Sequence, residues 1–320
     1  PILGRAMILY SLETLQAVTG RRPVAVIGYE AEQIQQAVGD QAEFVLQAPQ
    51  LGTGHALQQA QARLEGKTDQ VLVTNADMPL LQAETLQQLI QVQSENSGPL
   101  TMLTLQADDP RGFGRIVRAE DGRVLAIVEE AQASESQKRI KELNASAYCF
   151  NAEWLWQALP RIPISPKGEY YLTDLVEIAV KEGRQVEAIL LEDARQAIGI
   201  NTRVHLAEAE ALLRGWINQR WMLAGVTLVD PAATYIEPGV EIGQDSVIWP
   251  NTYLQGNSRI GPGCCLGPNS IVRNSTLGER CQVVQSTLEC ATLDSNVSVG
   301  PSTHLRKGTY MAPGVPLGNY

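Results

Sequence analysis

Val71-Leu72-Val73-Thr74-Asn75-Ala76-Asp77-Met78-Pro79 is the segment around which the first half of the chain is organised. Its apolar, β-branched start predicts a short strand from Val71 to Thr74, covered on both faces as in a parallel sheet. Pro79 ends it, because proline has no amide hydrogen for the ladder. Asp77 then lies beyond the carboxyl end of a central strand, where open α/β sheets bind ligands. A carboxylate there suits a divalent cation facing a substrate phosphate, although Asp77 capping the next helix or turn is the alternative.

Strand and helix patterns alternate on both sides of this segment. Apolar spacing predicts helices at 7–19, 30–38, 53–64 and 83–92, and strands at 24–28, 43–47 and 71–74. Alternation at this spacing indicates parallel βαβ units with right-handed crossovers. After Gly98 we expect strands at 100–105, 145–150 and 186–190, a hairpin of 115–118 with 124–128, and a helix at 172–181. Residues 1–202 are thus expected to form one α/β domain, and residues 203–225 a helical connector.

From residue 226 onward, aliphatic residues recur at a nearly constant step of six. The series runs through Ile236, Ile242, Ile248, Leu254, Ile260, Leu266 and Val272, then Ile271, Leu277 and Val283 after a one-residue shift, then Leu288, Leu293, Val299, Leu305, Met311 and Leu317. Such a hexapeptide repeat predicts a parallel β-helix at 226–320. Each repeat turns one aliphatic residue inward, and we expect small residues and glycines at the corners. A single coil cannot be stable alone, so the coils stabilise one another.

Length and composition restrict the class of protein. The chain has 320 residues, which favours two domains, and a net charge of −10 with no run of Lys or Arg. That charge argues against a nucleic-acid or membrane surface. No apolar run approaches the roughly 18 residues of a membrane span, and no signal peptide is evident.

Cysteine and histidine usage points to a cytoplasmic protein without zinc. The five cysteines are odd in number and include no CxxC pair, which suits reduced thiols. The three histidines are far apart in sequence, so a zinc site is not expected.

A glycine-containing loop, Gln47 to Ala56, follows one expected strand and opens the next helix. Its sequence is Gln-Ala-Pro-Gln-Leu-Gly-Thr-Gly-His-Ala. Glycines let a backbone close on a ligand, and a helix amino end favours anions or carbonyl oxygens. The Gln47 amide offers both a donor and an acceptor to a base edge. A tight strand-to-helix turn without a ligand is the alternative.

Several motifs, taken in order, resemble one family. They are Gln-Leu-Gly-Thr-Gly-His-Ala at 50–56, the Asp77 loop, Asp-Pro-Arg-Gly-Phe-Gly-Arg-Ile at 109–116, Ile-Val-Glu-Glu at 127–130, Gly-Glu-Tyr-Tyr-Leu-Thr-Asp at 168–174 and Ile-Asn-Thr-Arg at 200–203. With the hexapeptide region, the chain is similar throughout to the bacterial bifunctional N-acetylglucosamine-1-phosphate uridylyltransferase / glucosamine-1-phosphate N-acetyltransferase family. The resemblance implies a Rossmann-like nucleotidyltransferase domain with a mixed, mainly parallel sheet. A left-handed parallel β-helix that assembles as a homotrimer would follow it.

The resemblance also implies roles for particular residues. Those matched are Gln47, Gly52 and Thr53 for uracil; Asn75 and Ala76 in the substrate loop; Asp77 and Asn201 for Mg²⁺; Gly114, Glu129 and Asn144 for N-acetylglucosamine; and Arg306 for a sugar phosphate in the acetyltransferase site. The implied reaction is attack of N-acetylglucosamine 1-phosphate on the α-phosphorus of UTP, giving UDP-N-acetylglucosamine and pyrophosphate for cell-wall synthesis. Such transfer needs positioning and charge neutralisation. Acetyl-CoA would serve the second activity. Alternatively, Glu129 is a solvated charge and Asn201 a helix cap.

Departures from the family pattern lie mainly at the two ends. The family's Gly-rich nucleotide loop lies upstream of the segment matched by Pro1–Arg5, and further acetyltransferase residues lie beyond Tyr320. We therefore expect a fragment with little or no uridylyltransferase turnover and no acetyltransferase activity. Asn75-Ala76, Ala145-Ser146 and the lack of a basic residue soon after Glu129 are smaller departures.

Two other functions fit part of the pattern. One is a different sugar-nucleotide pyrophosphorylase with a β-helix, of the ADP-glucose or dTDP-sugar type. The other is a non-catalytic homologue that binds sugar nucleotides. Base preference in a binding assay separates the first of these, because Gln47, Gly52 and Thr53 are expected to favour uracil.

Overall fold

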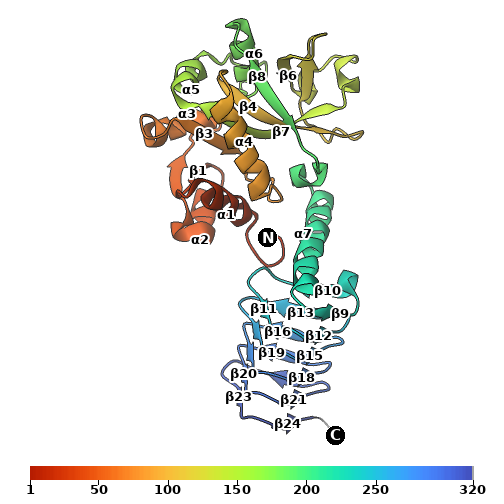
Figure 1. Cartoon of the computed structure of the whole chain (residues 1–320). Coiled ribbons are helices and arrows are strands. Elements are labelled where there is room, and N and C mark those ends of the chain that lie inside the picture. Colours follow the sequence, from red (N-terminus) through yellow and green to blue (C-terminus); the bar gives the residue numbers. More distant parts are fainter. Residues whose placement is uncertain (319–320) are drawn as a thin grey trace. The chain divides into compact units, whose positions relative to one another are not determined.

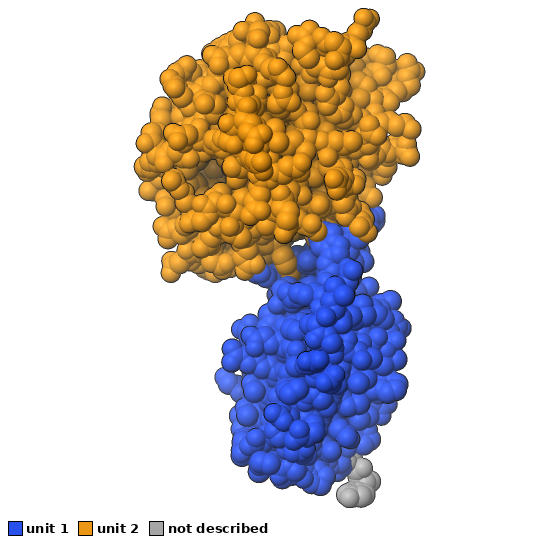
Figure 2. All heavy atoms as spheres, viewed as in Figure 1, with its two compact units in different colours: residues 1–5, 202–320 blue, residues 6–201 orange. Residues whose placement is uncertain are grey.

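The computed structural model describes residues 1–318 and comprises two compact units (Figures 1 and 2). The α/β unit contains residues 6–201, and the β-helix unit contains residues 1–5 together with the chain from Thr202 onward. The first five residues were expected in the α/β domain. They join the other unit because Leu3 packs into the β-helix core and its amide donates to Glu210 Oε2 at 3.4 Å.

The α/β unit begins with a small layer of its own. Helix α1 (Met7–Thr19) ends at Gly20, which has a left-handed φ of 65°. Strands β1 (Val24–Ile27) and β2 (Glu43–Leu46) pair in parallel as a two-stranded sheet, with α2 (Ala31–Val38) between them in sequence. One separate hydrophobic cluster joins these elements through Leu9, Leu12, Ala25, Ile27 and Val38.

The main sheet of this unit is mixed. Its strands run in the order β6-β5-β7-β4-β8, and β3 pairs with β7 outside that path. Strands β4 and β8 are parallel, whereas β3, β4 and β5 all pair with β7 in antiparallel fashion, and β5–β6 is a hairpin. The bounds are β3 (Gln70–Thr74), β4 (Leu100–Gln106), β5 (Arg115–Arg118), β6 (Val124–Val128), β7 (Glu142–Asn151) and β8 (Val186–Leu190).

The mixed sheet is confirmed, but the expected parallel surroundings of the Val71 strand are wrong. Within residues 1–318, the β3 ladder has one partner, β7, and that partner is antiparallel. Only Val71 in β3 is fully buried, while Leu72 to Thr74 are half-buried. The spacing of apolar residues indicates which positions are buried, but it does not identify the neighbouring strand. That neighbour is β7, which follows the β5–β6 hairpin in sequence and runs antiparallel to β3. Antiparallel pairs therefore outnumber the two parallel pairs, β1–β2 and β4–β8, in this unit.

Helices flank the main sheet and enclose two further hydrophobic clusters. They are α3 (Thr53–Leu64), α4 (Ala83–Glu95), α5 (Ala152–Ala158) and α6 (Asp174–Lys181). Helix α5 was not predicted. It starts because Asn151 Oδ1 accepts from the Trp154 amide at 2.9 Å, and five of its seven residues are buried. Short 3₁₀ turns lie at 39–41, 130–132, 137–139, 159–161, 194–197 and 231–233.

The β-helix unit confirms the hexapeptide prediction. After α7 (Arg203–Leu223), short strands stack in three parallel sheets. The first contains β10 (Thr234–Ile236), β13 (Thr252–Gln255), β16 (Ile271–Arg273), β19 (Thr287–Glu289) and β22 (His304–Leu305). The second contains β11 (Glu241–Ile242), β14 (Arg259–Ile260), β17 (Thr276–Leu277), β20 (Thr292–Leu293) and β23 (Tyr310–Met311). The third contains β9 (Thr227–Leu228), β12 (Val247–Ile248), β15 (Cys265–Leu266), β18 (Gln282–Val283), β21 (Ser298–Val299) and β24 (Pro316–Leu317).

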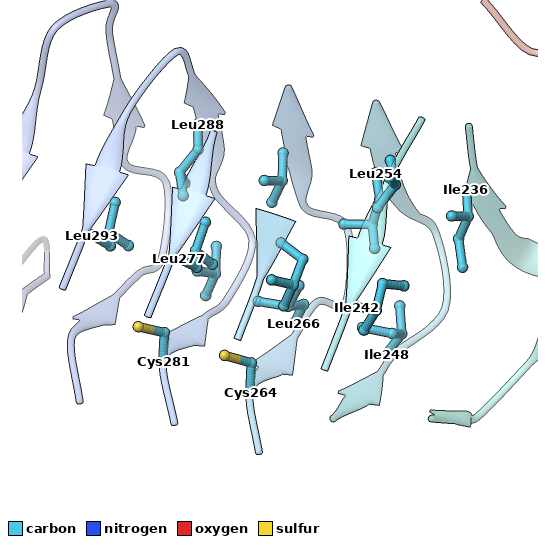
Figure 3. Packing of buried hydrophobic residues seen from close by; sticks show 14 of the residues in the cluster. Ile236, Ile242, Ile248, Leu254, Cys264, Leu266, Leu277, Cys281, Leu288 and Leu293 are labelled. Atoms are coloured by element: carbon cyan, nitrogen blue, oxygen red, sulfur yellow. The ribbon is translucent and has the colours of Figure 1, made fainter. Parts of the chain in front are cut away.

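The inward aliphatic residues form ladders through this unit. Figure 3 shows Ile236, Leu254 and Leu288 among the side chains that point into the coil. Val272, rather than Ile271, is the inward residue of β16, since Val272 is wholly buried and Ile271 only half-buried. Within residues 1–318, none of the helices combines the length and apolarity needed to cross a lipid bilayer.

Corners of the β-helix include the expected glycines, with left-handed φ at Gly256, Gly263, Gly308 and Gly314, but are not confined to them. Left-handed φ angles occur at many non-glycine corners: Asp245, Asn251, Asn269, Asn274, Arg280, Gln285, Cys290, Asn296 and Ser302. The glycines after inward aliphatic residues have another cause, which is close stacking. A Cβ on Gly261 would lie 2.5 Å from the Gly278 carbonyl oxygen, and one on Gly243 would lie 2.4 Å from the Pro262 nitrogen. These positions are glycine because the next coil occupies the space.

Candidate functional site

The Asp77 loop and the segment that ends at Asn201 are held together by a backbone hydrogen bond. Ile200 donates its amide to the Asp77 carbonyl oxygen at 2.9 Å, so Asn201 follows directly after the residue that is tied to Asp77. Ile200 and Asp77, which are 123 positions apart in sequence, therefore meet within the α/β unit. Next to Asp77, Asn75 is half-buried and Ala76 is exposed.

The Asp77 carboxylate is suited to hold a cation. Its Oδ1 is buried without a hydrogen-bond partner, and burial raises the pKa of the carboxyl group, with a smaller opposing effect from its own amide. A desolvated carboxylate oxygen with an unmet acceptor is stabilised by a nearby positive charge. Oxygen ligands of this type are those that Mg²⁺ prefers. No cluster of three or more His, Cys, Asp or Glu with metal-site geometry occurs among residues 1–318. Substrate phosphates would have to complete such a site.

Neither Asp77 nor Asn201 caps a helix. Helix α4, the next after Asp77, has Gln82 at its N-cap and receives no side-chain cap there. Helix α7 is capped by Thr202, whose Oγ1 accepts from the His205 amide at 3.1 Å. Asp77 is therefore not the cap of α4, and Thr202 rather than Asn201 is the cap of α7.

The Gln47 loop packs tightly against the segment 170–172. Thr53 Oγ1 accepts from the Leu172 amide at 3.0 Å, and the Gly54 amide donates to the Tyr170 carbonyl at 2.8 Å. A Cβ on Gly52 would lie 2.7 Å from the Tyr170 carbonyl oxygen, and Gly52 has φ of 92°. Glycine is thus required here by the neighbouring backbone, which is a structural reason separate from any ligand.

The Gln47 side chain is held inside this loop. Its Nε2 donates to the Gly52 carbonyl oxygen at 3.0 Å and lies 3.0 Å from His55 Nδ1. The backbone amide of Gln47 donates to the Ile27 carbonyl at 2.8 Å, which fixes the residue at the end of β2. The loop thus presents Gln47, Gly52 and Thr53 in one short, braced stretch.

Gly114 and Asn144 are neighbours across β5 and β7. The Asn144 amide donates to the Gly114 carbonyl at 2.9 Å, and a Cβ on Gly114 would lie 2.8 Å from Ile127 Cγ2. The buried Asn144 side chain donates through Nδ2 to Tyr148 Oη at 2.6 Å and accepts at Oδ1 from the Ser146 amide at 3.1 Å. The amide of Asn144 therefore has one defined orientation.

Glu129 follows β6 and is not a solvated charge. It is half-buried, and its Oε1 accepts from Thr173 Oγ1 at 2.8 Å. Burial, Glu177 and Glu129 raise the pKa of nearby Asp174 to about 6. The surroundings of Glu129 are thus acidic, in keeping with the missing basic residue noted from the sequence.

A partly buried ion pair that sequence reasoning missed joins the two ends of the β5–β6 hairpin. Arg115 is 1% exposed, its guanidinium lies 2.5 Å from Glu130 Oε2, and it also donates to the Phe113 carbonyl. Arg115 and Glu130 directly follow Gly114 and Glu129, so the pair fixes the spacing of those two residues. The sequence signal for this ion pair was Arg115 itself, because an arginine within a buried strand needs an acidic or hydrogen-bonding partner.

Arg306 belongs to the β-helix unit. It is exposed and directly follows β22, on a corner where its carbonyl accepts from the Thr309 amide at 3.0 Å. Ten of the predicted site residues thus lie in the α/β unit, and Arg306 lies in the other unit.

Comparisons with known proteins match two family models to successive parts of the chain. A nucleotidyl transferase family model matches residues 1–222, and a bacterial transferase hexapeptide model with six repeats matches residues 239–274. The bifunctional protein GlmU of Exiguobacterium sibiricum is 41% identical over all of this chain and 72% of its own length. That of Enterococcus faecalis is 39% identical over all of this chain and 70% of its own length.

A solved structure shows a similar fold. It is a putative glucose-1-phosphate thymidylyltransferase from Bacillus anthracis in complex with a sucrose, with a TM-score of 0.53 and 18% identity over 66% of this chain and 84% of that chain. The family resemblance drawn from the motifs is confirmed by these comparisons. Because a nucleotidyl transferase domain precedes hexapeptide repeats and the identity extends along the whole chain, this protein is a transferase that belongs to the family of bifunctional GlmU proteins.

Proposed function

We propose that the α/β unit binds UTP and N-acetylglucosamine 1-phosphate and transfers a uridylyl group between them, giving UDP-N-acetylglucosamine and pyrophosphate. The observation that carries this proposal is the buried, unpartnered Asp77 Oδ1 beside the segment of Asn201. Gln47, Gly52 and Thr53 would contact uracil. Gly114, Glu129 and Asn144 would contact the sugar, since Asn144 and Glu129 offer oriented polar groups.

Mg²⁺ held by Asp77 and Asn201 would offset the negative charge of the phosphates. The protein's own contribution is positioning. The bond from Ile200 to Asp77 fixes the loop, while Tyr148 and Thr173 fix the two sugar-contacting side chains. A phosphoryl-type transfer gains most from such alignment, because no covalent protein intermediate is required.

We also propose that the β-helix unit serves acetyl transfer from acetyl-CoA to glucosamine 1-phosphate, with Arg306 as a sugar-phosphate ligand, and that it assembles as a homotrimer. One β-helix sheet supports the assembly. Its outward strand residues are uncharged: Thr227, Val247, Cys265, Gln282, Ser298 and Pro316. Exposed Val229, Trp249 and Val284 continue this face. Such composition is typical of the centre of an interface. The proposed nucleotide and sugar-phosphate substrates support a cytoplasmic location.

Isothermal calorimetry with UDP-N-acetylglucosamine, with and without Mg²⁺, tests the proposal. This compound carries uracil, diphosphate and sugar together, so it reports on both subsites. We expect Mg²⁺ to strengthen binding and Asp77→Ala to abolish that strengthening. Asp40→Asn, at an exposed position, is the control and is expected to behave as the parent protein. A parent protein that does not bind, or an Asp77→Ala variant that keeps the full Mg²⁺ effect, would refute the assignment.

A further inference from the structure

The amide of Gln47 has both of its hydrogens engaged within the protein. Gly52 O and His55 Nδ1 each lie 3.0 Å from Nε2, and a primary amide nitrogen has two N–H groups. The carbonyl oxygen, Oε1, is then the end of the side chain that remains for a ligand. Turning the amide over would set Oε1 against the Gly52 carbonyl, so two acceptors would meet. The orientation is therefore fixed by the loop.

His55 can support this orientation in one tautomer. Its Nε2 lies 3.1 Å from Gln59 Nε2, and a neutral imidazole has only one acceptor nitrogen. Gln47 is also held by Gly52 at 3.0 Å, whereas Gln59 is held by the His55 carbonyl at 3.3 Å. Because the contacts of the Gln47 amide are shorter than those of the Gln59 amide, we assign Nδ1 as the acceptor nitrogen of the His55 ring. The proton then lies on Nε2, and the Gln59 amide turns its oxygen toward it and gives up the weaker bond from its Nε2 to the His55 carbonyl.

We infer that His55 is a positioning residue for base selection, which acts by presenting Gln47 Oε1 to the nucleotide. This inference rests on the proposed function, in which Gln47 contacts uracil. Uracil has an N–H donor at N3, which Oε1 accepts. Cytosine has a lone pair at N3, which Oε1 repels. Without the His55 acceptor, one amide hydrogen of Gln47 is released and only the Gly52 carbonyl still opposes turning of the amide, so a larger fraction of Gln47 can present its nitrogen to cytosine.

The test compares the affinities of UDP and CDP, measured by calorimetry in the presence of Mg²⁺. The parent protein is expected to prefer UDP. His55→Leu removes the acceptor and is expected to reduce the UDP-to-CDP preference by about five- to tenfold, the worth of one net hydrogen bond. His55→Asn restores an acceptor, because Asn Oδ1 is as many bonds from the backbone as His Nδ1, and it is expected to recover the preference.

Gln59→Leu is the matched control, since it removes the other partner of the imidazole and leaves Nδ1 in place. Its UDP-to-CDP ratio is expected to match the parent. A His55→Leu variant that weakens both nucleotides equally would show a purely structural role and overturn the inference. If the parent protein bound UDP and CDP equally, the inference about His55 would be wrong, although the proposal that the α/β unit binds a nucleotide would be unaffected. Binding of neither nucleotide would overturn the proposed function as well.

Discussion

Asp174 begins helix α6 at a half-buried position close to Glu177 and Glu129, and these surroundings raise the pKa of its carboxyl group to about 6. Between about pH 4 and pH 6 the folded protein keeps a proton that the unfolded chain has lost. Stability therefore falls as the pH rises through this window, and the full penalty remains above it.

Asp174→Asn is therefore expected to raise the thermal midpoint at pH 8 and to have no such effect near pH 3.5. After allowance for solvent screening of a half-exposed group, the gain is about 1 kcal/mol. Scanning calorimetry at both pH values measures it. Asp69→Asn provides a comparison without these carboxylate neighbours. An equal shift at both pH values would mean that charge is not the cause.

At the residue scale, the candidate site was predicted from motif order rather than from chemistry. Asp77 was assigned from its place after a strand, and Asn201 needed the family pattern, because nothing in the residues between them reports the Ile200–Asp77 bond. Tyr148 and Thr173 were missed because their roles depend on side-chain hydrogen bonds that residue type does not report, within β7 for Tyr148 and between distant segments for Thr173. The reason for Gly52 was also incomplete, since the Tyr170 carbonyl requires it.

At the scale of elements, the stacked coils of the β-helix make a sharp prediction about glycine. A Cβ on Gly261 would lie 2.5 Å from the Gly278 carbonyl oxygen, and backbone cannot move aside easily. Gly261→Ala is expected to destabilise the protein by about 1–3 kcal/mol, as overpacking does.

Gly215→Ala is the matched substitution within the same unit. Gly215 lies inside α7, and nothing is within 4 Å of a Cβ built there. Alanine is favoured over glycine in a helix interior, so a gain of about 0.5–1 kcal/mol is expected. Urea unfolding of both variants gives the comparison. Opposite signs are expected, and a destabilising effect of similar size in both would contradict the stacking argument.

Elements were predicted unevenly, for physical reasons. The β-helix could be predicted from the sequence because each inward aliphatic residue stacks on the inward residue of the next coil. The spacing of these residues along the sequence therefore gives the length of the coil directly. Strand β3 was located correctly, but its antiparallel pairing with β7 depends on a contact distant in sequence. Left-handed corners at Arg280 and Gln285 were not predictable from residue type, because coil stacking imposes them.

At the scale of the whole molecule, the proposed homotrimer predicts that one face of the β-helix governs assembly. Val284 is 38% exposed and lies just after β18 on the uncharged face. A glutamate there would bring three buried charges together. Val284→Glu is expected to convert a trimer into a monomer in sedimentation velocity.

Thr276→Glu, on β17 in a different sheet, is the control and is expected to remain trimeric. A parent protein that sediments as a monomer would refute the proposed assembly. Dissociation by both variants would show that the uncharged face is not the specific contact.

The β-helix coils differ in length while their register is kept. Val247 pairs with Cys265, 18 positions later; Cys265 pairs with Gln282 after 17, and Gln282 with Ser298 after 16. The differences fall in the corners, so the inward ladders continue unbroken. Single-codon deletions and insertions at these corners should therefore be tolerated, and the part of the gene that encodes the β-helix can change length during evolution without losing its fold.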